Sequence, residues 1–142
     1  MKRIASALLC VMLTLAFLAP VSGQDFDAKL FEGPWAGKWT STCRTPGDNA
    51  PTNALIQVDL NSKVATVIMF QDVAPPAPSF SSMAMGKLEG GKIIIDAASS
   101  GISGGGSKMS FWLEGPMLLR GTYENEQDCG TFSLRRNSNK GA

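Results

Sequence analysis

The chain has 142 residues, 44% of them hydrophobic, and its 13 basic and 12 acidic residues give a formal net charge of +1. A near-neutral charge without a basic run argues against nucleic-acid binding and against an electrostatic membrane patch. Histidine is absent from the sequence, which removes the usual general base, the usual partner of a catalytic nucleophile and the commonest zinc ligand. We therefore predict a protein that is not an enzyme and that uses no metal and no cofactor.

The N-terminal segment has the pattern of a secretory signal peptide. Lys2 and Arg3 precede an apolar run over 4–18, and Pro20 and a few small residues follow it. Such a run is too short to span a bilayer comfortably, and proline breaks its helix early, so a membrane anchor is the less expected alternative. We predict that residues 1–23 are a signal peptide and that the mature chain, without a membrane span, is secreted or periplasmic.

After this segment, short runs of alternating apolar and polar residues recur to the end of the chain. The sequence predicts eight strands, at 35–43, 54–60, 64–70, 82–88, 92–97, 108–113, 117–123 and 129–136. A proline-rich stretch at 73–78 and a Gly/Ser-rich stretch at 99–107 are typical of connections. No convincing helical period follows the signal, although 27–31 could hold one helical turn.

Eight strands in sequential hairpins, with no helix to cover a sheet face, favour a closed barrel or a flattened sandwich. Cys10 lies in the predicted signal, which leaves Cys43 and Cys129 to form one disulfide in an exported domain. In a closed meander the end of the first strand lies beside the start of the last, where these cysteines fall. We predict that residues 24–136 form an all-β, eight-stranded antiparallel up-and-down barrel closed by one disulfide, and that 137–142 is a polar tail.

The sequence does not determine which side chains of the last strand point into the barrel. If Cys129 points inward, strict alternation also places Arg135 inside the barrel and the apolar Phe132 and Leu134 outside. A bulge near Gly130 would reverse this arrangement. The two alternatives bury opposite faces of the same strand.

An eight-stranded barrel either fills with side chains or holds one small ligand. Methionine and aromatic side chains can line an adaptable apolar pocket, and they can equally fill a core. Our candidate ligand-binding residues are Met83, Met85, Phe111 and Tyr123, with Met109 beside them. The other large residues expected inside are Ile56, Leu60, Ile68, Ile93, Ile95 and Leu119, with Thr66 and Ser41 as polar groups. Apolar residues expected on the outer face are Leu55, Val67, Met69, Ile94 and Trp112.

Gly37-Lys38-Trp39 in the first strand, together with Arg135 or Arg136 in the last, resembles the calycin barrels, a group containing lipocalins and avidins. In those families a Gly-x-Trp places its indole across one end of the barrel, and a late arginine packs on it. The resemblance implies that Gly37, Trp39 and Arg135 close one end of this barrel and that Trp39 is buried.

Ala36-Gly37-Lys38-Trp39 is also similar to the start of bacterial periplasmic metalloprotease inhibitors, which are exported eight-stranded barrels with one disulfide. We expect an exported, non-enzymatic binding protein that takes a small apolar ligand in the barrel mouth or a protein partner on its surface. The alternative that this second resemblance implies is a protease inhibitor acting through residues 24–34. An enzyme that uses carboxylates is a further alternative.

Overall fold

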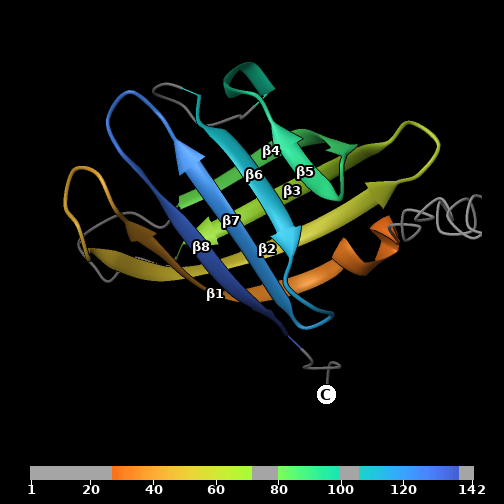
Figure 1. Cartoon of the computed structure of the whole chain (residues 1–142), viewed down its shortest axis with the longest axis horizontal. Helices are drawn as coiled ribbons and strands as arrows, with labels where there is room; N and C mark the ends of the chain where they lie inside the picture. Colours follow the sequence, from red (N-terminus) through yellow and green to blue (C-terminus); the bar gives the residue numbers. More distant parts are fainter. Residues whose placement is uncertain (1–26, 72–79, 100–105, 138–142) are drawn as a thin grey trace, which may run out of the picture.

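Eight antiparallel strands close into a barrel in the computed structural model of this protein (Figure 1). The structure describes residues 27–71, 80–99 and 106–137. The strands are β1 (Gly33–Ser41), β2 (Asn49–Asp59), β3 (Val64–Gln71), β4 (Phe80–Glu89), β5 (Lys92–Ile95), β6 (Lys108–Leu113), β7 (Leu118–Glu124) and β8 (Cys129–Arg136). Each strand pairs with its neighbours in the sequence, and β1 also pairs with β8. The predicted eight-stranded antiparallel barrel is thus confirmed.

Cys43 and Cys129 form the predicted disulfide, with their Cα atoms 5.2 Å apart. Cys43 lies in the loop after β1, whereas Cys129 begins β8. The predicted signal peptide and the proline-rich stretch lie outside the described residues. Neither 3-10 helix of the described part, η1 (Ala28–Phe31) or η2 (Ala97–Ser99), is long and apolar enough to cross a bilayer.

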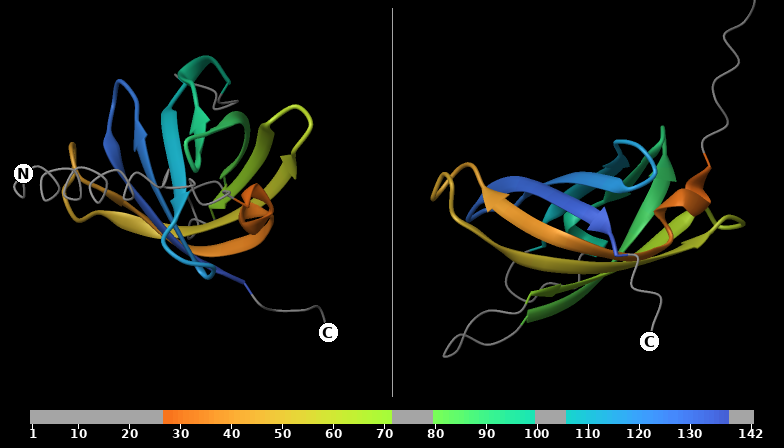
Figure 2. Two further views of the ribbon diagram at one scale, coloured as in Figure 1. Left: turned by 45° about the vertical axis from the view of Figure 1, so that its right-hand side comes forward. Right: turned by 90° about the horizontal axis from the view of Figure 1, so that it is seen from below.

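One end of the barrel, which we call the sealed end, is covered by η1 (Figure 2). The Asp27 side chain caps this helix by accepting a hydrogen bond from the Lys29 amide at 3.0 Å. Phe31 is fully buried, and the Trp35 Nε1 donates to the Phe31 carbonyl at 2.8 Å. The Arg136 guanidinium lies 4.3 Å from the centre of the Trp35 ring.

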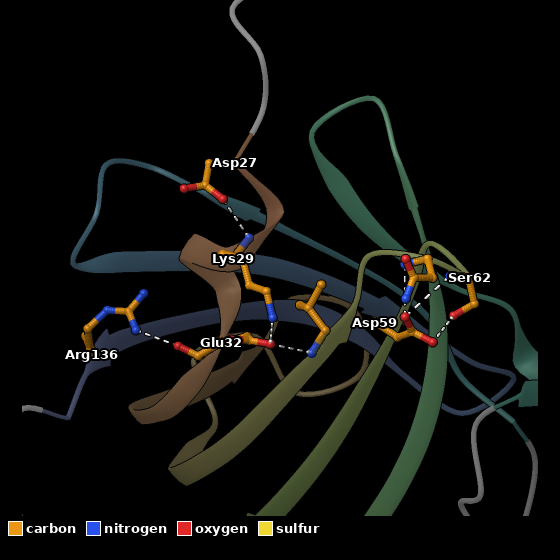
Figure 3. Close-up of polar contacts among 8 residues, drawn as sticks. Asp27, Lys29, Glu32, Asp59, Ser62 and Arg136 are labelled. Atoms are coloured by element: carbon orange, nitrogen blue, oxygen red, sulfur yellow. Dashed lines mark hydrogen bonds and ion pairs between the residues drawn. The ribbon is translucent and has the colours of Figure 1, made fainter.

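Arg136 also ties this helix to the last strand. Its Nη1 donates to the Glu32 carbonyl at 2.6 Å (Figure 3), and its Nη2 donates to the Leu30 carbonyl. On the same side, the Asp59 carboxylate accepts a hydrogen bond from the Ser62 hydroxyl at 2.7 Å and so holds the turn between β2 and β3. The arginine thus satisfies carbonyl groups that the short helix leaves without an internal partner.

The tryptophan that seals this end is Trp35, not the predicted Trp39, and of the two candidate arginines, Arg135 and Arg136, it is Arg136 that packs on it. The register of β1 and β8 places Trp35 opposite Arg136, and both side chains turn toward the sealed end. Arg135 is exposed on the outer face. Gly37 is nevertheless required by the packing, because a Cβ there would lie 2.9 Å from the Leu134 Cα and collide with the Ser133 carbonyl.

The alternation along β8 is opposite to the one that an inward Cys129 implies. Gly130, Phe132 and Leu134 are buried in the barrel. The register pairs Ser41 with Gly130, so Cys43 lies beyond the end of β1 and the disulfide joins the rim rather than the interior. No bulge is needed, because the cysteines do not share the inward face.

The predicted facing of β3 is also wrong. Ala65, Val67 and Met69 are buried, whereas Thr66 and Ile68 point outward. Because this strand is apolar on nearly both faces, its alternation does not indicate which face is buried. The pairing register with β2 determines the buried face. Leu60, expected inside, lies in the turn after β2 and is 50% exposed.

Met83 and Met85 lie on the outer face of β4, where they are 57% and 55% exposed. The inward positions of β4 hold the small residues Ser82, Ala84 and Gly86. A Cβ on Gly86 would come within 2.6 Å of Ile93, so the isoleucines of β5 occupy the volume that a larger inward residue of β4 would need. The prediction that these two methionines line the barrel mouth is therefore wrong.

Candidate functional site

A cavity of about 320 Å³ lies at the end of the barrel opposite η1, which we call the open end. Here β1, β3, β5 and β7 finish, and the disulfide joins the first loop to β8. The residues around this cavity are Trp39, Arg44, Met69, Gln71, Ser107, Met109, Tyr123, Asn125, Gln127, Asp128 and Phe132. Its volume is that of a small-molecule site.

The wall of the cavity is mostly apolar, and each of five strands contributes one large side chain. Trp39 of β1, Met69 of β3, Met109 of β6, Tyr123 of β7 and Phe132 of β8 surround the cavity. The Trp39 and Tyr123 rings meet edge to face at 6.2 Å, and the Tyr123 and Phe132 rings lie 5.4 Å apart. These aromatic contacts hold a shaped, rigid surface.

Large buried side chains occupy the barrel interior beyond this cavity. Phe111 is fully buried and packs on Phe132 with a ring separation of 5.3 Å. Toward the sealed end, Leu119 and Leu134 are also fully buried. The described residues thus form a packed core toward the sealed end and leave a cavity at the mouth.

A larger depression of about 740 Å³ runs over the rim beside this cavity. It includes residues that point away from the barrel axis, among them Lys108, Thr122 and Glu124, and it shares Met109 and Tyr123 with the first cavity. Because these outward residues form part of its lining, it extends over the outer surface of the barrel rather than into its interior. The smaller cavity is the better candidate for a binding site, because large inward side chains of the barrel contribute to its wall.

Asp128 joins three parts of the rim. Its Oδ1 accepts hydrogen bonds from the Ser41 hydroxyl at 2.8 Å and from the Arg44 amide at 3.1 Å. Its Oδ2 accepts from the Tyr123 hydroxyl at 2.7 Å. This network, next to the disulfide, fixes the Tyr123 ring in the cavity wall.

The same contacts set the ionisation of both groups. The hydrogen bond from Tyr123, followed by the one from the Arg44 amide, lowers the pKa of Asp128 to about 2. Burial, followed by the hydrogen bond to Asp128, raises the pKa of Tyr123 above its ordinary value. Asp128 is therefore ionised and Tyr123 neutral near pH 7, and neither is suited to transfer protons there.

We expect Asp128 to make the stability of the rim depend on pH. Its pKa is lowered from 3.8 to about 2 in the folded protein, so the stability that its ionised form contributes is present above pH 4 and is lost as the pH falls through about 2. Between pH 5 and pH 2, the urea midpoint of the wild type should fall more than that of Asp128→Asn.

The matched control for this prediction is Asp96→Asn, which changes an exposed carboxylate outside the network. Its pH profile should follow that of the wild type. Equal acid sensitivity of Asp128→Asn and the wild type would contradict a role for the Asp128 network in stability.

Of the four predicted ligand-binding residues, only Tyr123 borders the cavity. Phe111 is inside the barrel but lies behind Phe132, and the two outer methionines of β4 are elsewhere. The sequence analysis placed Met69 on the outer face, left the facing of Phe132 open, and assigned Trp39 to the wrong end. The apolar residues Phe132 and Leu134, two positions apart, were the signal that this face of β8 is buried.

No protein-family model matches the sequence, and no curated protein matches it. Within 27–71, 80–99 and 106–137, no group of three or more acidic or cysteine side chains is placed to hold a metal ion. The site is thus defined by its own geometry, as an apolar cavity with a rigid aromatic wall and a hydrogen-bonded rim.

Proposed function

We propose that this protein is an exported, non-enzymatic binding protein that holds a small apolar ligand at the open end of a calycin-like barrel. The observation that carries the proposal is the cavity of about 320 Å³ with large apolar side chains from five strands in its wall. Its opposite end is sealed by η1 and Trp35. A barrel sealed at one end and hollow at the other is suited to hold one small ligand.

The calycin assignment is supported by the sealed end. Gly33-Pro34-Trp35 is a second Gly-x-Trp in the first strand, and Arg136 of the last strand packs on its indole. This is the arrangement that the resemblance implies, moved four residues toward the N-terminus. Export is supported by the disulfide, which is typical of oxidising compartments, and by the signal-like N-terminal pattern.

The alternative, a protease inhibitor acting through residues 24–34, receives less support. The described part of that segment packs on the barrel, since Ala28 and Phe31 are buried and Arg136 binds the carbonyl groups of Leu30 and Glu32. An inhibitory arm needs side chains that are free to enter a protease cleft. Within residues 27–34, the large side chain of Phe31 is instead buried in the core.

The proposal predicts saturable binding of a neutral apolar probe, N-phenylnaphthylamine, measured by its fluorescence. Met109→Gln should weaken this binding roughly 5- to 10-fold, because an amide in the cavity wall must be desolvated when the probe enters. Met83→Gln is the matched control, since it makes the same change on the outer face, and it should leave the affinity unchanged.

Urea denaturation of both variants establishes that they are folded before binding is compared. Equal weakening by the two substitutions would place the probe outside the barrel mouth. Absence of saturable binding to the wild type would contradict the proposed function, and inhibition of a secreted metalloprotease that is lost on truncating residues 24–34 would favour the alternative.

A further inference from the structure

The two tryptophans of β1 differ in what their indole N–H groups do. The Trp35 Nε1 donates to the Phe31 carbonyl at 2.8 Å, so its hydrogen bond belongs to the fold. The Trp39 Nε1 is shielded from solvent, and no acceptor in the described part of the chain receives its proton. A buried donor without an acceptor destabilises the folded protein, and such a group in a native protein calls for an explanation.

Trp39 lies in the wall of the open-end cavity, where most other polar side chains are already bonded to the protein. Tyr123 donates to Asp128 at 2.7 Å, Asn125 donates to Ser107 at 3.0 Å, and the Gln71 amide lies 3.5 Å from the Thr52 hydroxyl. Among the described residues, the Trp39 Nε1 is the one buried side-chain polar atom without a partner.

We infer that the ligand of this cavity carries a hydrogen-bond acceptor that binds the Trp39 Nε1, an inference that rests on the proposed function. The cavity wall supplies the apolar contacts, and the indole N–H supplies one directional contact that fixes the orientation of the ligand. A purely hydrocarbon ligand would leave this donor unsatisfied in a water-excluded site. An acceptor on the ligand removes that cost.

The charges around the cavity favour an uncharged acceptor, such as the carbonyl oxygen of a ketone, aldehyde, ester or amide. The acidic side chains around the cavity and rim outnumber the basic ones: the acidic residues are Asp96, Glu124, Glu126 and Asp128, and the basic residues are Arg44 and Lys108. A carboxylate would therefore gain no net electrostatic attraction there. One hydrogen bond from a neutral N–H does not offset the free energy needed to desolvate a carboxylate. Because the Nε1 is shielded in the absence of a ligand, the inference requires side chains of the cavity wall to shift when the ligand enters, and flexible methionines such as Met69 and Met109 suit this.

The test compares two probes of the same shape by isothermal titration calorimetry: naphthyl methyl ketone, which has a carbonyl oxygen, and isopropenylnaphthalene, which has a methylene group in its place. The ketone should bind the wild type roughly 3- to 10-fold more tightly, the contribution of one hydrogen bond. Trp39→Phe keeps an aromatic side chain and removes the N–H, so it should abolish this preference while isopropenylnaphthalene still binds.

Trp112→Phe is the matched control, because Trp112 lies on the outer face near Lys92. It should preserve the preference for the ketone. A second readout is nuclear magnetic resonance: of the three tryptophan indole N–H resonances, that of Trp39 should move downfield with the ketone and not with isopropenylnaphthalene.

The outcomes separate this inference from the proposed function. If both probes bind the wild type equally and Trp39→Phe changes neither affinity, the acceptor is refuted while the binding function stands. If neither probe binds, both are refuted. If the naphthoate anion binds more tightly than the ketone, the assignment to an uncharged acceptor is overturned.

Discussion

Replacing Trp35 by alanine should lower the free energy of unfolding by about 3–5 kcal/mol, the range for removing a large buried aromatic side chain. Trp35 is only 1% exposed and packs in the core beside Phe31. Its loss removes the Nε1 hydrogen bond to η1 and the ring on which the Arg136 guanidinium stacks. The sealed end would lose the side chain that connects η1, β1 and β8.

Urea denaturation followed by far-ultraviolet circular dichroism measures this effect. The control is Trp112→Ala, which removes the same type of side chain from the outer face. There the Lys92 Nζ lies 5.5 Å from the centre of the Trp112 ring. We expect a loss of about 1 kcal/mol or less there. Similar midpoints for Trp35→Ala and the wild type would contradict the role of Trp35 in sealing the barrel.

Removing the disulfide should have an effect of comparable size. Cys43 and Cys129 are separated by 86 positions in the sequence, and in the chain-entropy model a link across a loop of that length stabilises the fold by on the order of 4 kcal/mol. The double replacement Cys43→Ser and Cys129→Ser should therefore lower the free energy of unfolding by an amount of that order.

Reductant provides the matched control for this experiment. It should lower the urea midpoint of the wild type toward that of the double-serine variant and leave the variant unchanged. Removing the disulfide should also destabilise the open end. Beside the disulfide, the Thr42 amide donates to the Cys129 carbonyl and the Ser41 hydroxyl donates to Asp128. Two titratable thiols in the folded, non-reduced protein would refute the disulfide.

The two Gly-x-Trp motifs of β1 show where local pattern stops being informative. Trp35 and Trp39 lie four residues apart and therefore on the same face of a strand. Nothing in either motif says which one lies at the barrel end. Which tryptophan lies there depends on η1, whose Phe31 carbonyl accepts the Trp35 hydrogen bond. It also depends on the register, which places Arg136 opposite Trp35.

The candidate site could be predicted only in part for a related reason. An apolar mouth lined by aromatic and methionine side chains was expected, and Tyr123 does border it. Met69 was placed on the wrong face because β3 is apolar on both sides, and the facing of Phe132 in β8 stayed open. The unpartnered Trp39 Nε1 has no signature in the sequence, because hydrogen-bond satisfaction depends on groups far apart in the chain.

The sequence by itself determined the eight strands, their antiparallel order and the disulfide, because period-2 alternation, turn residues and two well-placed cysteines are local or nearly local properties. Only the tertiary structure decided which face of each ambiguous strand points inward. On β4 the large Met83 and Met85 lie outside because Ile93 and Ile95 already fill the space beside Gly86. Burial there is set by the volume left between neighbouring strands, which no single strand encodes.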